Sequence, residues 1–197
     1  AGGHDTCRGY VPGEGVPPVR SALDTHAMAR WCVDLAVRRQ LCAGARPDRI
    51  ALLDNFCWPD PVLSVETPDG PYKAAQLVRA CRGLYEACLA YGTPLISGKD
   101  SMKNDAVLGG VKISVPPTLL VSALGLIDDV REAVTLDFKA AGDAVFVLGT
   151  LRPALGGSEY LRWRGAEDGL TVSSGAPAPY VGSEPPLLRT EETLPPY

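Results

Sequence analysis

Histidine is almost absent from this sequence, and so are the short motifs of hydrolytic enzymes and zinc sites. His4 and His26 are the only histidines among 197 residues. The sequence contains no Gly-x-Ser-x-Gly or Gly-x-Cys-x-Gly segment, and its six cysteines form no Cys-x-x-Cys pair. These absences argue against a Ser-His-Asp or Cys-His catalytic group and against a zinc knuckle.

Long runs of one chemical character are also missing. The 19 basic and 23 acidic residues are mixed along the chain and give a formal net charge of −4. The longest apolar stretch, residues 119–127, is too short to cross a bilayer as a helix, and no signal-peptide pattern begins the sequence. We therefore expect a cytoplasmic enzyme or binding module with no nucleic-acid partner and no membrane partner.

The cysteines fit a reduced protein better than a disulfide framework, because no secretion signal accompanies them. Cys81 and Cys88 lie seven residues apart in a helical pattern, which places them on one helix face with Val78 and Leu84. We interpret them as small buried apolar side chains. Hydrophobic residues make up 46% of the chain, which is enough to build such a core.

Two segments have the spacing of amphipathic helices. The first covers about residues 24–43, where Asp24 can cap the first turn. The second covers about residues 72–91 and is followed by Gly92 and Pro94, which are typical of a helix end. Short apolar or alternating segments predict strands at residues 50–56, 94–97, 111–115, 119–127 and 144–149.

Composition and periodicity divide the chain into four segments. Residues 1–20 are rich in glycine and proline and predict an irregular lead-in. Residues 21–135 contain most of the periodic segments and predict one domain, and residues 136–163 predict the start of a second. Residues 164–197 are rich in glycine, proline, serine and glutamate and predict an irregular tail. We expect the lead-in and the tail to be poorly ordered.

Residues 97–101 (Ser97-Gly98-Lys99-Asp100-Ser101) predict a polar turn directly after a short apolar strand. Glycine lets a backbone approach a phosphate closely, while Lys99 and Ser101 add a cation and a hydroxyl. Asp100 supplies the oxygen ligand that magnesium prefers. The segment is not a Walker A loop, because Gly-x-x-x-x-Gly-Lys-Ser/Thr is absent. On spacing alone, a solvent-exposed hairpin turn fits these residues at least as well as a phosphate site.

Two further segments have both a binding and a structural interpretation. Asp54 and Asn55 end an apolar strand, where α/β proteins often place ligand contacts, but they could equally satisfy nearby backbone groups in a turn. The Gly156-Gly157-Ser158 segment could receive an anion on its amides, although an ordinary loop fits it better.

Taken together, the motifs resemble one family, the synthetase part of phosphoribosylformylglycinamidine synthase. The run Asp54-Asn55-Phe56-Cys57-Trp58 and the run from Ser97 to Ser101 lie within the similar segments. The similar segments are residues 47–58, 91–102, 116–123 and 155–160. They occur in the family's order and at its spacing, and the resemblance extends over about residues 22–162.

The resemblance implies an α+β fold of the aminoimidazole ribonucleotide synthase superfamily. Its N-terminal domain is a half-barrel sheet with flanking helices, which pairs with a second synthase-like domain, and the start of a C-terminal α+β domain follows. The implied activity uses ATP and Mg²⁺ to phosphorylate the amide oxygen of formylglycinamide ribonucleotide. Ammonia from a glutaminase partner then displaces phosphate to form formylglycinamidine ribonucleotide in purine biosynthesis.

The resemblance also implies roles for five residues. Asp54, Gly98 and Lys99 fall at nucleotide-binding positions. Asp100 falls where a metal contact is expected, and Ser101 falls at a substrate contact. No residue of this chain is assigned a catalytic role.

The sequence departs from the family pattern in its first predicted helix. The family's Glu-x-x-x-Asn magnesium ligands fall on Leu35 and Arg39, which cannot hold a hard cation. The family's catalytic histidine region and its Asp-x-Ser-x-Gly-Gly segment are expected to lie outside these 197 residues. Two hypotheses follow: part of an ATP-dependent ligase that is inactive alone, or a degenerate, non-catalytic half that binds a nucleotide or serves as a scaffold.

Overall fold

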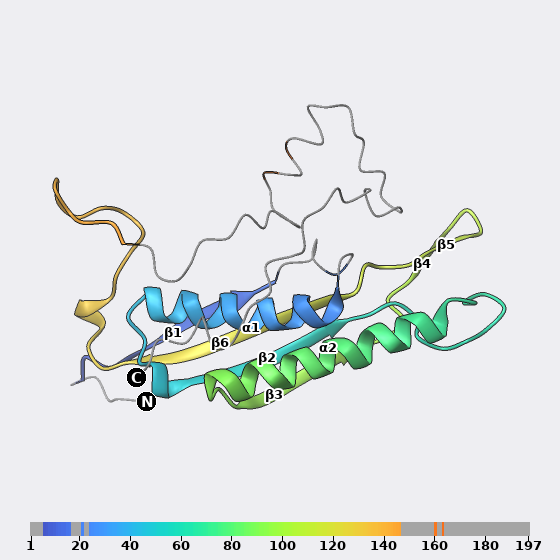
Figure 1. The fold of residues 1–197 in the computed structure, drawn as a ribbon, viewed down its shortest axis with the longest axis horizontal. Coiled ribbons are helices and arrows are strands. Elements are labelled where there is room, and N and C mark those ends of the chain that lie inside the picture. The colour runs from blue at the N-terminus through green and yellow to red at the C-terminus, as the bar shows by residue number, and fades with distance from the viewer. Residues whose placement is uncertain (1–5, 17–20, 22–23, 147–159, 161–162, 164–197) are drawn as a thin grey trace.

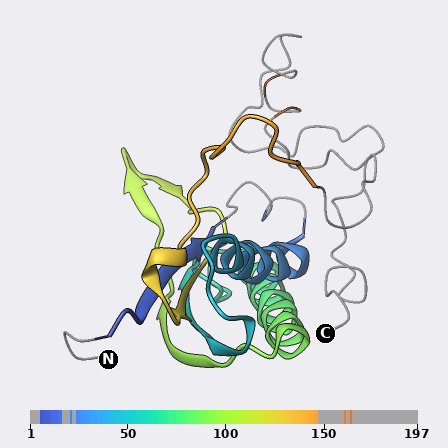
Figure 2. The ribbon, with the colours of Figure 1, turned by 90° about the vertical axis from the view of Figure 1, so that its left-hand side faces the viewer.

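The computed structural model describes residues 6–16, 21, 24–146, 160 and 163. Within them, a four-stranded sheet is covered on one side by two long helices, α1 (Thr25–Cys42) and α2 (Gly70–Tyr91) (Figure 1). The view along the sheet in Figure 2 shows both helices on the same side. Among these residues, no helix is both long and apolar enough to span a membrane.

The sheet mixes parallel and antiparallel pairing. Its order is β1 (Gly9–Gly15), β6 (Thr118–Ile127), β2 (Ile50–Cys57) and β3 (Leu95–Ser101). Strands β2 and β3 run parallel and are joined by α2, because a parallel pair requires a long crossover connection. Strand β6 is antiparallel to both β1 and β2. The edge strands are therefore β1 and β3.

The core lies between the sheet and the helices. Because side chains alternate along a strand, Ile50, Leu52 and Phe56 of β2 all point toward the helices and are buried. The largest fully buried side chain is that of Trp58, whose indole N–H donates to the Lys73 carbonyl oxygen at 3.0 Å. The core is completed by Met28, Ala29, Cys32, Val33, Ala36, Val37, Ala80, Leu84, Ala87, Leu119, Val121 and Ala123.

Both predicted helices are confirmed, with ends close to those expected. Asp24 caps α1, since its side chain accepts from the backbone N–H of His26 at 2.9 Å. Gly92 ends α2 in the left-handed conformation (φ 64°), which costs glycine nothing. The strands predicted at residues 50–56 and 119–127 are confirmed as β2 and β6.

The predicted irregular lead-in is wrong for residues 9–15, which form β1 and pair with β6 along their whole length. Its glycines hide the strand from the sequence pattern. A Cβ on Gly15 would lie 1.9 Å from the Cys32 carbonyl oxygen, and one on Gly13 would lie 2.6 Å from the Gln40 side-chain nitrogen. Of the four inward positions of this strand, Gly9, Gly13 and Gly15 are glycines and only Val11 is apolar, so no alternation is visible.

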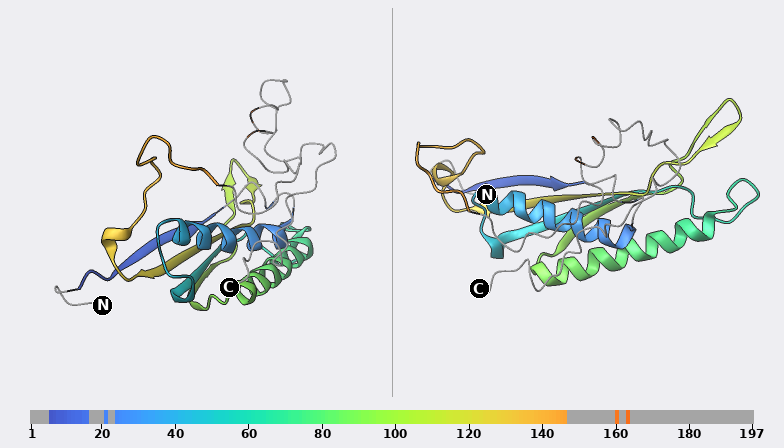
Figure 3. Two further views of the ribbon diagram at one scale, coloured as in Figure 1. Left: turned by 60° about the vertical axis from the view of Figure 1, so that its left-hand side comes forward. Right: turned by 45° about the horizontal axis from the view of Figure 1, so that its top comes forward.

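The predicted turn at residues 97–101 is also wrong, because β3 continues through Ser101. Strand β3 is an edge strand with exposed side chains, so a polar sequence does not prevent its pairing with β2. The strand predicted at residues 111–115 is shorter than expected. It forms β5 (Val111–Ile113), which pairs with β4 (Ala106–Leu108) in a hairpin that projects from the body (Figure 3).

Other predictions are settled only in part. Cys32 is buried, but Cys81 is exposed and Cys88 is half-buried, so the interpretation of both as buried side chains is wrong for Cys81. The described cysteines are all free thiols. Residues 144–146 are not in a strand, and the rest of the predicted strand at 144–149, the tail at 164–197 and Gly156-Gly157-Ser158 lie outside the described residues. The domain boundary near residue 135 stays a prediction.

The close approach of β1 to α1 gives a stability prediction. Replacing Gly15 by Ala should lower the free energy of unfolding by about 1–3 kcal/mol, because the new Cβ would meet the Cys32 carbonyl. Glu14→Ala is the matched control, since it loses only an exposed ion pair with Arg39, of less than about 1 kcal/mol. Urea denaturation measures both, and a Gly15→Ala protein as stable as the unmodified chain would contradict this packing.

Candidate functional site

The main candidate site is a groove between α2 and the β3 edge of the sheet, with a volume of about 790 Å³. Asp54 of β2 and Asp100 of β3 are its charged residues. Helix α2 forms one wall, and the α2–β3 connection forms one end. The remaining lining residues are Phe56, Cys81, Leu84, Tyr85, Cys88, Leu89, Gly92, Thr93, Pro94 and Leu95.

The pairing of β2 with β3 brings the two carboxylates together. Asp54 is opposite Gly98, and Phe56 is opposite Asp100, so both acidic side chains point to the helix side of neighbouring strands. A Cβ on Gly98 would lie 2.6 Å from Asp54 Oδ1. The absence of a side chain at Gly98 therefore makes room for the Asp54 carboxylate within the groove.

The carboxylates of Asp54 and Asp100 give the groove a negative charge. Burial, and then the nearby Asp100 carboxylate, raise the pKa of Asp54 above its ordinary value. Within the described part of the chain, neither carboxylate takes part in an ion pair. A cation placed between them would relieve their repulsion.

Lys99 and Ser101 lie on the other face of the sheet from this groove. They alternate with Gly98 and Asp100 along β3, and the Lys99 ammonium donates to the Ser101 hydroxyl. The five residues predicted from the sequence therefore share one strand pair but divide between two faces. Because β3 is an edge strand, a ligand lying along it can reach both faces.

The two α1 positions that depart from the family pattern do not line the groove. Arg39 pairs with Glu14 at 2.6 Å, and Leu35 is half-buried on α1. Asp34, which precedes Leu35 on α1, is buried, and its carboxylate pairs with Arg38 at 2.7 Å. It was not among the residues predicted from the sequence. The i,i+4 spacing of these two residues is the sequence signal that could have identified this pair.

The residues of the groove fit magnesium better than a softer metal. Over the described residues, no group of three or more histidine, cysteine or acidic side chains could hold a metal ion. Asp54 and Asp100 supply two hard oxygen ligands on one face. Mg²⁺ is usually held by one or two carboxylates together with waters and phosphate oxygens, so this pair suits a metal that arrives with a nucleotide.

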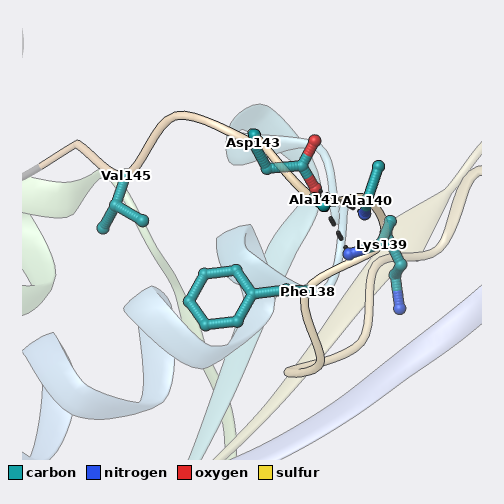
Figure 4. Close-up of a pocket in the computed structure, with 7 residues that line it drawn as sticks. Phe138, Lys139, Ala140, Ala141, Asp143 and Val145 are labelled. Carbon is teal, nitrogen blue, oxygen red and sulfur yellow. Dashed lines mark hydrogen bonds between the residues drawn. The ribbon is translucent and has the colours of Figure 1, made fainter.

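A second hollow, of about 470 Å³, lies within the loop of residues 138–145 (Figure 4). Its carboxylate, Asp143, already accepts from the backbone N–H groups of Lys139 and Ala140 at 3.2 and 2.9 Å. One loop forms all of this hollow, and its acidic group has partners. It is therefore not a candidate site.

Comparison with known proteins identifies the family. Residues 14–127 match the family described as AIR synthase related protein, N-terminal domain. The chain belongs to this family. It is 37% identical over 139 residues to phosphoribosylformylglycinamidine synthase subunit PurL of Gloeobacter violaceus, a match that covers 71% of this chain and 17% of that protein. The predicted family is thereby confirmed.

Solved structures confirm the predicted α+β fold class. Thermotoga maritima PurL complexed with ATP has 26% identity and a TM-score of 0.51, covering 66% of this chain and 20% of that one. T. maritima PurL complexed with FGAR has 23% identity and a TM-score of 0.54, and the match covers 68% of this chain and 19% of that one. At this identity the likeness concerns the fold alone. The chain thus spans about one fifth of the length of these relatives.

The raised pKa of Asp54 predicts a specific pH dependence of stability. Above the ordinary value of 3.8, the folded chain keeps a proton on Asp54 that the unfolded chain has lost, so the free energy of unfolding falls as the pH rises. Asp54→Asn removes this contribution. The difference in stability between the unmodified chain and Asp54→Asn should therefore decrease as the pH rises above about 4 in urea denaturation.

Asp48→Asn is the control for this measurement. The Arg46 guanidinium lowers the pKa of Asp48, so its contribution is lost only as the pH falls below the ordinary carboxyl range. The difference in the free energy of unfolding between the unmodified chain and Asp48→Asn should stay constant above about pH 4. A level difference for Asp54→Asn as well would contradict the raised pKa.

Proposed function

We propose that this chain is part of an ATP-dependent ligase of de novo purine biosynthesis. The ligase converts formylglycinamide ribonucleotide, ATP and glutamine-derived ammonia to formylglycinamidine ribonucleotide, ADP and phosphate. The observation that carries this proposal is a groove of a PurL-like chain that holds two carboxylates, Asp54 and Asp100, neither of which forms an ion pair within the described residues. T. maritima PurL, a structural relative at 26% identity, has been solved with ATP, which supports a nucleotide-binding role. We place the protein in the cytoplasm.

Each predicted residue has a role in this proposal. Asp100, with Asp54 beside it, would hold a Mg²⁺ ion that accompanies the nucleotide, and Gly98 leaves the space that the Asp54 carboxylate occupies. Lys99 contacts the phosphates around the edge of β3, where its ammonium adds positive charge. Ser101 contacts the substrate from the same face as Lys99.

The chemistry requires charge to be balanced at the transferred phosphoryl group. An amide oxygen is a poor leaving group until it is phosphorylated. Magnesium, when bound, would offset the charge that develops on the phosphates. The described residues supply metal and phosphate contacts but no assigned acid or base. We therefore propose that the chain contributes one part of the site and does not catalyse alone.

The open face of the sheet supports the proposed pairing with a second synthase-like domain. Leu124 and Leu126 of β6, with Tyr10 of β1, leave apolar side chains exposed on the face opposite the helices. An apolar sheet face of this kind gains free energy when another sheet covers it. A glutaminase partner would supply the ammonia.

A second candidate function is a degenerate, non-catalytic half that holds a nucleotide or serves as a scaffold. It is favoured by Leu35 and Arg39, which stand at the family's magnesium positions and cannot ligate the ion. In this alternative, the carboxylate groove of β2 and β3 keeps at most a structural role.

Nucleotide binding tests the proposed function directly. The unmodified chain should bind ADP in the presence of Mg²⁺ in calorimetric titration. Gly98→Val should weaken this binding at least tenfold, because its side chain would displace the Asp54 carboxylate. Ser97→Ala is the control, since it alters the neighbouring residue on the opposite face and should bind like the unmodified chain.

The thermal melt of each variant shows whether it is folded. If the unmodified chain shows no heat of binding with ADP and Mg²⁺, the nucleotide-binding function is wrong. Equal affinities of Gly98→Val and the unmodified chain would instead remove Asp54 from the site.

A further inference from the structure

The projecting hairpin of β4 and β5 exposes an apolar face (Figure 3). Leu108, Val111 and Ile113 are 66%, 64% and 48% exposed. Side chains alternate along a strand and paired residues point to the same side, so these three share one face of the hairpin with Ala106. An apolar surface of this kind on a projecting arm indicates a docking site.

The other face of the hairpin is fixed to its own chain through Lys112. The Lys112 ammonium lies 3.3 Å from an Asp105 carboxylate oxygen and 3.7 Å from one of Asp60, and it donates to the Thr67 hydroxyl. Lys112 is the only charged residue among residues 106–113. The apolar face therefore carries no charge, and a second copy of it would meet no like-charge repulsion.

The edges of the hairpin are open, because β4 and β5 pair only with each other in the part of the chain that the structure describes. The turn between them has two residues, Gly109-Gly110, with φ of 57° and 79°. In such a hairpin the pair that flanks the turn, Leu108 with Val111, exchanges both hydrogen bonds. The next pair, Val107 with Lys112, does not. The backbone N–H and C=O of Val107 therefore point to the free edge of β4.

Symmetry distinguishes the two edges. A strand that pairs antiparallel with its own copy about a two-fold axis places its central residue opposite itself. For β5 this residue is Lys112, and like charges directly opposite each other are destabilising. For β4 it is Val107, which is β-branched, uncharged and 68% exposed. Self-pairing is therefore favoured at β4.

We propose that the β4 edge docks a second copy of this chain. The two hairpins form one sheet in the order β5-β4-β4-β5, and the apolar face continues across it. A two-stranded hairpin is only marginally stable, whereas four strands with an apolar face are stable, so pairing also stabilises the arm. An unpaired edge is the usual template for such an addition.

The antiparallel arrangement also gives the dimer further contacts. The tip of each hairpin points to the base of the other, where the loop of residues 60–69 exposes Val62, Leu63 and Val65. Strands of three residues bury little area, so we expect a weak dimer, with a Kd on the order of 10 μM to 1 mM. This surface is separate from the carboxylate groove and from the open face of the main sheet.

Sedimentation equilibrium of the full chain, from about 10 μM to about 1 mM, tests the proposal. Val107→Pro removes the free N–H but no hydrogen bond of the hairpin, and proline is tolerated on an edge strand. We expect it to weaken the dimer at least about tenfold. Val107→Thr is the matched control, because threonine is β-branched and keeps the N–H. Its Kd should stay within about threefold of that of the unmodified chain.

A cross-link reports the register of the two copies. Val107→Cys should form an intermolecular disulfide on mild oxidation, because Cα atoms of directly paired residues lie about 5.5 Å apart. Peptide mass spectrometry should find the introduced thiol joined to its own copy rather than to a native cysteine. Val111→Cys is the control, since β5 does not meet its own copy and this variant should form no such link.

Several outcomes would overturn the inference. A chain that stays monomeric to about 1 mM does not dock a second copy. A dimer that Val107→Pro leaves unchanged lies elsewhere, and its loss on Leu124→Lys would assign it to the open face of the main sheet. If Val107→Thr abolishes the dimer as fully as Val107→Pro, contacts between side chains and not strand pairing join the copies. Val107→Pro should bind ADP and Mg²⁺ like the unmodified chain, which shows that it is folded.

Discussion

The parallel pairing of β2 with β3 is the interaction on which the site depends. It sets Asp54 opposite Gly98 and places Asp100 on the same side of the sheet, toward α2. A shift of this pairing by one residue would turn the β3 side chains to the other face and separate the two carboxylates. Helix α2 fixes the arrangement, since it is both the crossover between these strands and one wall of the groove.

Glycine accounts for much of what the sequence predicted wrongly. The two helices and the strands β2 and β6 follow from ordinary periodicity, because most of their inward positions are apolar. Strand β1 does not, because Gly13 and Gly15 lie where α1 approaches too closely for a side chain. The polar residues 97–101 predicted a turn for a different reason. Strand β3 lies at the edge of the sheet with exposed side chains, and only its pairing with β2 identifies it as a strand.

The candidate site was predictable in its residues but not in its geometry. Family resemblance placed Asp54, Gly98, Lys99, Asp100 and Ser101 together, and they do lie on one strand pair. Their division between two faces depends on strand alternation through a segment that predicted a turn. The room that Gly98 leaves for the Asp54 carboxylate cannot be predicted from sequence, because it depends on packing between distant segments.

The most direct test of the site is the position of a metal ion in a crystal of this chain grown with ADP and Mn²⁺, which replaces Mg²⁺ and is located by its anomalous scattering. The groove geometry predicts an anomalous peak within ligand distance of the Asp54 and Asp100 carboxylate oxygens. A peak at another acidic cluster, with none beside Asp54 and Asp100, would contradict the assignment of these two residues to the metal.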